Sequence, residues 1–263
     1  MAGIENIKVI VAAHKPYPMP ADTLYLPVLA GARQHDEKMY TPDDTGENIS
    51  KKNPNYCELT ALYWAWKNLE TDRLGLCHYR RYFMGTGAFS ANGKEFRILG
   101  AGDAAELLEE YDVILPKKRN YYIETTYSQY AHAHHRADLD TTRQIILEKC
   151  PEYLKDFDRL MEKTEGHKFN MFLMKRRLLD RYCTWLFGIL FELEKRLDIS
   201  HYSANDARVF GFVAERLLDV WLDRNGIGYC ELSVVNCESQ NWPKKGAAFL
   251  GRRLKGRLRG NRR

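Results

Sequence analysis

The sequence has no long apolar run. Its longest, residues 183–191, is far shorter than the roughly 18 residues that a membrane span needs. A second apolar stretch, residues 9–13, follows Lys8 and is stopped by residues 14–16, so it indicates a first strand rather than a secretory signal. We therefore expect a chain that does not cross a bilayer.

Paired cysteines and a phosphate loop are also missing. The six cysteines are scattered and none forms a C-x-x-C pair, so we expect reduced, partly buried thiols in a cytoplasmic protein. No glycine-rich loop follows the first strand. The polar turn at residues 14–18 is therefore, taken alone, only a weak sign of a nucleotide site.

Acidic residues are absent from residues 244–263, which carry nine Lys or Arg. The other 31 basic residues face 35 acidic ones, so the body of the chain is slightly acidic and nucleic acid is not an expected partner. We divide the chain into one large domain, residues 1–243, and a basic tail, residues 244–263. As a helix the tail would align Leu254 and Leu258 among cations, which suits an anionic membrane surface; a solvated, disordered tail is the alternative.

Alternating strands and helices predict an α/β fold with a mainly parallel central sheet flanked by helices and a helical C-terminal part. The expected strands are residues 7–13, 74–77, 111–116, 169–174 and 229–235. One helix is expected to start at residue 53 or 55, and four others are expected at residues 139–149, 152–162, 176–196 and 204–224. Residues 18–52 are expected to form a long loop, and the glycine-rich residues 85–102 a flexible excursion.

Residues 72–83 are the stretch around which the fold is expected to be organised. A short buried strand there ends at His78, and Tyr79, Arg80, Arg81 and Tyr82 follow. The carboxyl ends of parallel strands face the ligand crevice, and two adjacent guanidinium groups are best tolerated opposite an anion. The anion could be a ligand. Alternatively, the two arginines point to opposite faces of an extended chain, one paired with a carboxylate and one solvated.

Two other polar clusters have open interpretations. Asp43, Asp44 and Glu47 could hold a metal or form a turn with solvated carboxylates. The histidines of residues 132–135 lack the spacing of a zinc site, so one of them could hydrogen-bond a substrate hydroxyl, or all could be surface residues.

Several blocks carry a family resemblance, and the most specific is His-Tyr-Arg-Arg-Tyr at residues 78–82. The chain resembles the bacterial capsular polysaccharide and O-antigen glycosyltransferases catalogued as DUF4422 over residues 7–20, 43–50, 53–68, 75–83, 169–174, 198–200 and 208–221. The resemblance extends to about Asn225. It implies a GT-A-like glycosyltransferase domain that moves a hexose, galactose or galactofuranose in some members, from a UDP-sugar to a lipid-linked glycan at the inner face of the cytoplasmic membrane.

One departure from metal-dependent transferases of this fold suggests a site without a metal. In metal-dependent transferases of this fold an Asp-x-Asp holds the divalent ion, but His78, Tyr79 and Arg80 stand at the corresponding place. We expect Arg80 or Arg81, together with His78, to neutralise the departing diphosphate, with no firm cofactor. Mn²⁺ or Mg²⁺ held by Asp43 and Asp44 is the alternative.

The remaining expected site residues follow from the same resemblance. Ala12, His14 and Lys15 should lie by the base and ribose, and Tyr17, Trp64 or Tyr79 could stack on a ring. Arg208 is expected at the donor. The base is expected to be Glu215, with Asp138 and then Asp206 as alternatives. A non-catalytic scaffold that binds glycan or nucleotide sugar is the competing reading.

Overall fold

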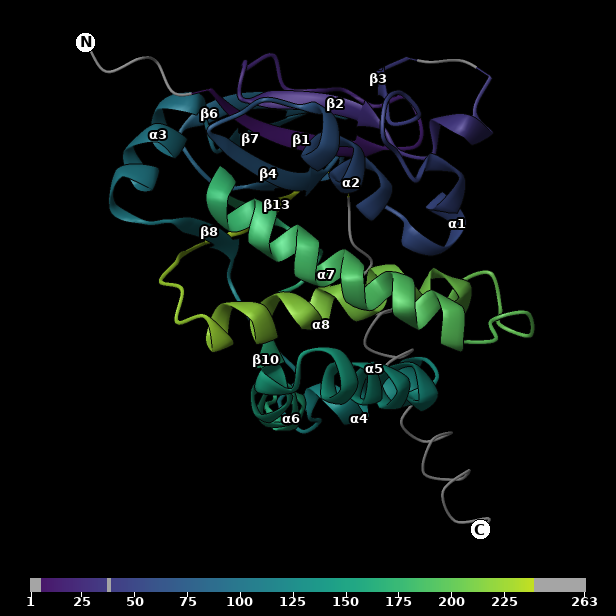
Figure 1. The fold of residues 1–263 in the computed structure, drawn as a ribbon. Helices are drawn as coiled ribbons and strands as arrows, with labels where there is room; N and C mark the ends of the chain where they lie inside the picture. The colour runs from purple at the N-terminus through teal and green to yellow at the C-terminus, as the bar shows by residue number, and fades with distance from the viewer. Residues whose placement is uncertain (1–5, 37–38, 239–263) are drawn as a thin grey trace.

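A computed structural model of the chain describes residues 6–36 and 39–238 (Figure 1). Its central sheet contains a parallel run of β3 (Thr41–Pro42), β2 (Tyr25–Leu29), β1 (Ile7–Ala13) and β4 (Arg73–His78), in that order. β1 lies between β2 and β4, and Val11 pairs with Cys77 on one side and with Pro27 on the other. The carboxyl ends of these strands therefore meet at one edge of the sheet.

The sheet continues beyond β4 with one reversed strand. β11 (Phe172–Lys175) runs antiparallel between β4 and β8 (Val113–Pro116), and β12 (Cys230–Leu232) is parallel to β8. After β4, the short β5 (Arg81–Phe83) turns back and pairs with β13 (Val234–Asn236). The predicted α/β fold with a mainly parallel sheet is confirmed.

Both faces of the sheet are covered, because alternate strand residues point to opposite sides. Ile10, Leu74 and Leu76 pack with α2 (Leu59–Asn68), α7 (Arg176–Arg196) and α8 (Val209–Arg224). Val9 and Val11 pack on the other side with α3 (Ala101–Glu110) and the hairpin of β6 (Gly87–Ala91) and β7 (Lys94–Ile98).

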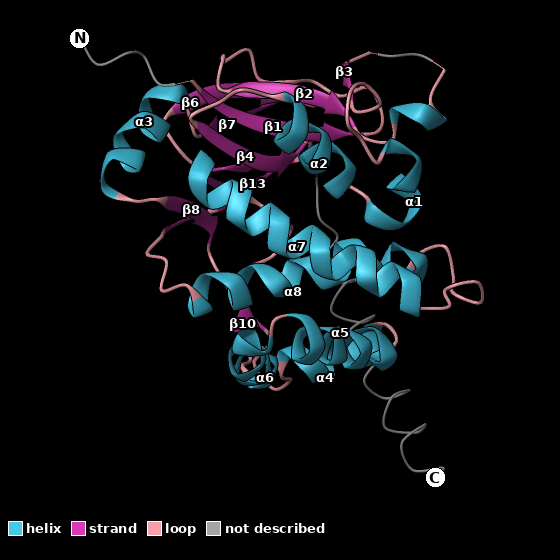
Figure 2. Cartoon of the chain, in the orientation of Figure 1, coloured by secondary structure: helices cyan, strands magenta, loops and turns pink. Residues whose placement is uncertain are grey.

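Three further helices form a layer beyond α8 (Figure 2). They are α4 (Thr126–Ala133), α5 (Arg136–Lys149) and α6 (Leu154–Glu162), and the small pair β9 (Arg119–Asn120) and β10 (Glu165–Gly166) lies beside them. None of the helices in the described ranges is both long and apolar enough to span a bilayer.

Three sequence expectations are wrong. The expected loop of residues 18–52 contains β2 and β3, and the expected excursion of residues 85–102 contains the β6–β7 hairpin. Asn92 and Gly93, both with positive φ, turn this hairpin, as Asn-Gly pairs often do. The single helix expected from residue 53 is instead two helices, α1 (Asn53–Tyr56) and α2. Cys57 lies between them and has a positive φ of 53°. The basic tail lies outside the described residues.

Candidate functional site

A cleft of about 530 Å³ opens at the carboxyl ends of β1 and β4. Ala12 of β1 is the register partner of His78 of β4, and both line the cleft, as does Ala30 at the end of β2. The other lining residues come from the turns after these strands, from α1 and the start of α2, and from the approach to α8: Ala13, His14, Lys15, Asn53, Pro54, Cys57, Glu58, Tyr79, Arg80 and Arg208.

Most of the residues expected at the donor lie together in this cleft. Seven of the ten line it: Ala12, His14, Lys15, His78, Tyr79, Arg80 and Arg208. The strand-end argument brought them together, because the ends of neighbouring parallel strands share one edge. Whether these residues bind a nucleotide stays a prediction.

The cleft is cationic, and two of its cations lie over the ring of Tyr79. The Tyr79 ring is buried, with Lys15 Nζ 5.3 Å and the Arg80 guanidinium 5.6 Å from its centroid. The rings of His14 and Tyr17 contact the Tyr79 ring edge-on, with centroid separations of 5.3 and 5.0 Å. Burial lowers the pKa of His14, and the neighbouring Lys15 and Arg80 lower it further, so His14 is neutral near pH 7.

Glu238 neutralises part of this charge. Arg80 Nη1 donates to Glu238 Oε2 at 3.0 Å, and Lys15 Nζ lies 3.5 Å from Oε1. Partial burial acts to raise the pKa of Glu238, but Arg80 and Lys15 hold it below its ordinary value. An anion entering between Lys15 and Arg80 must therefore compete with this carboxylate.

Arg81 and Arg80 lie on different sides of the chain. The Arg81 guanidinium stacks over the Phe169 ring at 4.4 Å, and its buried Nε has no hydrogen-bond partner among the described residues. Burial and the nearby Arg80 lower the pKa of Arg81. Arg80 lines the cleft and Arg81 does not, which agrees with the alternative in which the two arginines point to opposite faces; whether either binds a ligand stays a prediction.

Trp64 and Tyr17 do not line the cleft either. Trp64 is a buried core residue of α2 whose Nε1 donates to Thr45 Oγ1 at 2.9 Å. The Tyr17 ring contacts the Tyr79 ring edge-on, and the Tyr17 hydroxyl donates to the carbonyl of Cys237. It supports the cleft wall indirectly.

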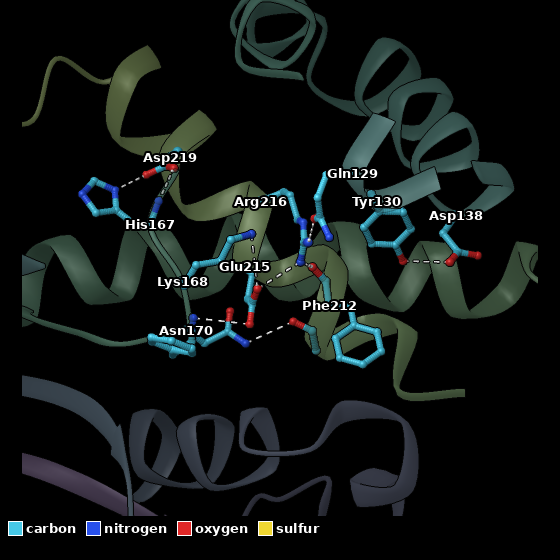
Figure 3. Close-up of polar contacts among 12 residues, drawn as sticks. Gln129, Tyr130, Asp138, His167, Lys168, Asn170, Phe212, Glu215, Arg216 and Asp219 are labelled. Carbon is cyan, nitrogen blue, oxygen red and sulfur yellow. Dashed lines mark hydrogen bonds and ion pairs between the residues drawn. The ribbon is translucent and has the colours of Figure 1, made fainter. Parts of the chain in front are cut away.

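Glu215 lies on α8 next to the strand-end region, in a set of buried charges (Figure 3). Its carboxylate accepts from the amide of Phe169 at 3.3 Å and from Arg216 Nη1 at 3.0 Å, and Lys168 Nζ lies 3.7 Å away. Burial acts to raise the pKa of Glu215, but Lys168 and Arg216 outweigh it and the pKa is lowered. Burial in turn lowers the pKa of Lys168 to about 7. Glu215 is therefore an anion held by two hydrogen-bond donors and by the charge of Lys168, and it is not among the residues that line the cleft.

Asp138, the second expected base, is a structural residue. It is buried, and its two oxygens accept from the hydroxyls of Tyr130 and Tyr202, each at 2.7 Å. Burial raises the pKa of Asp138, although the two hydroxyls act in the other direction. These bonds join α4 and α5 to the turn before α8, and none of the three residues lines the cleft.

Asp206 and the histidines of residues 132–135 also contact other side chains of the protein. His134 Nδ1 donates to Asp206 Oδ1 at 3.1 Å and its ring stacks on Phe212, whereas His132 pairs with Glu124. His135 stacks on Tyr202. His135 Nε2 also lies 3.9 Å from Asp206 Oδ2, so two of the three histidines share this carboxylate.

The acidic residues expected as an alternative metal site are dispersed as well. Asp43 is fully buried and accepts from the amides of Gly31 and Ala32 and from Ser50 Oγ, so it orders the turn after β2. Asp44 pairs with Arg33 at 3.7 Å. Among the described residues, no group of three or more His, Cys, Asp or Glu is arranged to hold a metal ion.

Sequence reasoning missed the α1–α2 side of the cleft. Asn53, Pro54, Cys57 and Glu58 line it, and Glu58 is the one carboxylate among its described lining residues. The available signal was the proline after Asn53, which marks a helix start close to the strand ends. The break at Cys57 that turns Glu58 into the cleft left no comparable signal.

Comparison with known proteins supports the fold and the family. The chain is similar to a solved structure described as the apo structure of the bifunctional glycosyltransferase WbbM, with 28% sequence identity and a TM-score of 0.81. The match covers 89% of this chain but only 46% of that one, so this chain spans about half of its length. No curated protein matches the chain. The family model described as "Domain of unknown function (DUF4422)" matches residues 8–226, and the chain therefore belongs to the DUF4422 family.

Proposed function

We propose that this protein is a glycosyltransferase that uses a nucleotide-sugar donor bound in the cleft at the ends of β1 and β4. The carrying observation is that Lys15, Arg80 and Arg208, three cations from separate elements, line one cleft. The similarity to a bifunctional glycosyltransferase and the family membership support the same reaction class.

The donor diphosphate is expected to lie between Lys15 and Arg80, the position that the Glu238 carboxylate occupies now. Charge-assisted hydrogen bonds from these cations would stabilise the departing nucleoside diphosphate, which is the task of a divalent ion in metal-dependent transferases. His78 donates from Nε2 to the Phe169 carbonyl at 2.6 Å, which fixes its ring beside the same cleft. Metal-independent cleavage is our hypothesis, and Asp43, with its oxygens already bonded, does not support the metal-dependent alternative.

The donor and acceptor follow from the family resemblance. We infer a UDP-hexose, with galactose or galactofuranose as the sugar, and a lipid-linked glycan of capsule or O-antigen synthesis as the acceptor. The basic residues 244–263 would bring the enzyme to the inner membrane surface. Removing the residues after Pro243 should then move the protein to the soluble fraction at moderate salt and leave transfer to a soluble acceptor intact.

Calorimetry with UDP tests the proposal. UDP should bind equally well with EDTA and with Mn²⁺, and Arg80→Ala should weaken binding about 10- to 100-fold, since a hydrogen bond to a charged group contributes about 1.5–3 kcal/mol. Arg143→Ala, which removes an exposed arginine paired with Asp158, is the control and should change nothing. Absence of UDP binding would favour the scaffold reading. Activity abolished by EDTA and restored by Mn²⁺ would refute the metal-independent mechanism.

A further inference from the structure

We propose that Glu58 is the base that takes the proton of the acceptor hydroxyl, an assignment that rests on the proposed transferase function. Glu58 is the one carboxylate among the described residues that line the cleft. It comes from the chain between α1 and α2, whereas Lys15 and Arg80 follow β1 and β4. The bond to be broken lies between a phosphate oxygen and the sugar, so a base must reach the cleft from the side away from those cations.

Two strained backbone segments meet at Glu58. Cys57, directly before it, has φ 53° and ψ −129°, and Phe169 and Asn170, before β11, have φ 76° and 53°. Such conformations cost about 1–3 kcal/mol each in residues such as Cys57 and Phe169, and they concentrate at functional sites; asparagine adopts them more readily. Here the strain turns Glu58 and the Asn170 amide toward each other, across 112 residues of chain.

The contacts hold one carboxylate oxygen and leave the other available. Asn170 Nδ2 donates to Glu58 Oε1 at 2.7 Å and also to the carbonyl of Gly211 on α8 at 3.1 Å. His78 Nε2, already donating to Phe169, lies 3.9 Å from the same Oε1. Within the described part of the chain, Glu58 Oε2 has no hydrogen-bond donor, so it retains the lone pairs that a proton acceptor needs.

Glu215 is less well suited to this role. Figure 3 shows Glu215 between Lys168 and Arg216, with Asn170 below it. Its oxygens are engaged by these cations and by the Phe169 amide, which lower its pKa and weaken it as a base. Glu215 instead orients the Phe169–Asn170 turn, which in turn positions Glu58.

The step is a single displacement with inversion at the anomeric carbon. The acceptor oxygen forms the new bond to that carbon while the bond to the diphosphate oxygen breaks, and its electron pair leaves on the nucleoside diphosphate. The hydroxyl proton passes to Glu58 Oε2 and then to solvent. No oxidant or other co-reactant is needed.

The test compares full-length parent, Glu58→Gln, Glu58→Asp and Glu58→Ala, with Glu192→Gln, a partly exposed glutamate that pairs with Arg196, as the control. The probes are UDP for binding, and UDP-galactose or UDP-galactofuranose with an octyl galactoside for transfer. Circular dichroism confirms folding. Glu58→Gln should bind UDP within about threefold of the parent but lose about 10²- to 10⁴-fold in kcat, the usual contribution of a general base.

Three results separate a base from a structural residue. The acidic limb of the kcat–pH profile should disappear in Glu58→Gln, Glu58→Asp should keep part of the rate, and formate should partly restore Glu58→Ala. If the parent binds UDP and transfers sugar but Glu58→Gln keeps its kcat, or the product retains the donor's anomeric configuration, the assignment of Glu58 is overturned and the transferase function stands. A parent that binds no UDP overturns both.

Discussion

Replacing Glu238 by glutamine should tighten the binding of UDP. In the structure the Glu238 carboxylate occupies the space between Arg80 and Lys15, at 3.0 and 3.5 Å, where we place the donor diphosphate. A ligand phosphate must break both ion pairs before it can make its own. Glutamine keeps the size of the side chain but removes the competing charge.

The expected gain is modest because both ion pairs are partly exposed. The Glu238 side chain is 32% exposed and that of Arg80 40%, and such pairs contribute about 0–1 kcal/mol each. Their loss from the unliganded state should therefore strengthen binding by at most about 2 kcal/mol, or about 30-fold. Screening should make the gain smaller at high salt.

Titration calorimetry at two salt concentrations measures this effect. Uridine, which has no phosphate, should bind parent and Glu238→Gln alike. Glu148→Gln, which breaks a similar exposed pair with Arg196, should leave UDP binding unchanged. If Glu238→Gln binds UDP no better, or more weakly, the carboxylate serves to position Arg80 and Lys15 rather than to compete with the ligand, and our placement of the diphosphate is refuted.

Three further substitutions test the assignments around the cleft. Burial lowers the pKa of Lys168 to about 7, against 10.5 ordinarily, so the unfolded chain binds more protons than the folded one between these pH values. The free energy of unfolding in urea should therefore rise with pH from about 7 to 10.5, and this rise should be absent in Lys168→Met. Asp138→Ala should cost about 3 kcal/mol in urea unfolding, because it leaves the buried Tyr130 hydroxyl unpaired, without changing UDP affinity. Trp64→Phe should cost about 1 kcal/mol by losing the bond to Thr45, again with unchanged UDP affinity; weaker UDP binding would return Trp64 to the ligand site.

Elements with an unambiguous hydrophobic pattern could be predicted from the sequence. β1 and α7 have the expected bounds, because a buried parallel strand is a continuous apolar run and a long helix repeats its apolar face over several turns. β2 was missed because Pro27 stands in its middle, where proline normally argues against a strand. The β6–β7 hairpin was missed because its glycine-rich composition outweighed the Asn92–Gly93 turn signal.

The cationic side of the site could be predicted, but the opposite side could not. His14 and Arg80 follow apolar strands directly, so their position at the strand ends is a local property of the sequence. The position of Glu58 depends on the backbone reversal at Cys57 and on a hydrogen bond from Asn170, far along the chain. Neither has a local pattern, which is why Glu215, on a clear helix, was the more visible acid.

The separation of charges in the cleft supports its assignment to a displacement at a phosphorylated sugar. A carboxylate that only stabilised the fold would be expected to pair with one of the nearby cations, because an unpaired charge is costly to bury. Instead Arg80 and Lys15 pair with Glu238, Arg208 donates to the Cys57 sulfur at 3.0 Å, and Glu58 receives a neutral amide. The basic group beside Glu58 is His78, whose Nε2 lies 3.9 Å from Oε1 but already donates to the Phe169 carbonyl. Holding cations and a free carboxylate oxygen apart in one cleft is what a reaction needs when it develops negative charge on a leaving phosphate and releases a proton from the attacking hydroxyl.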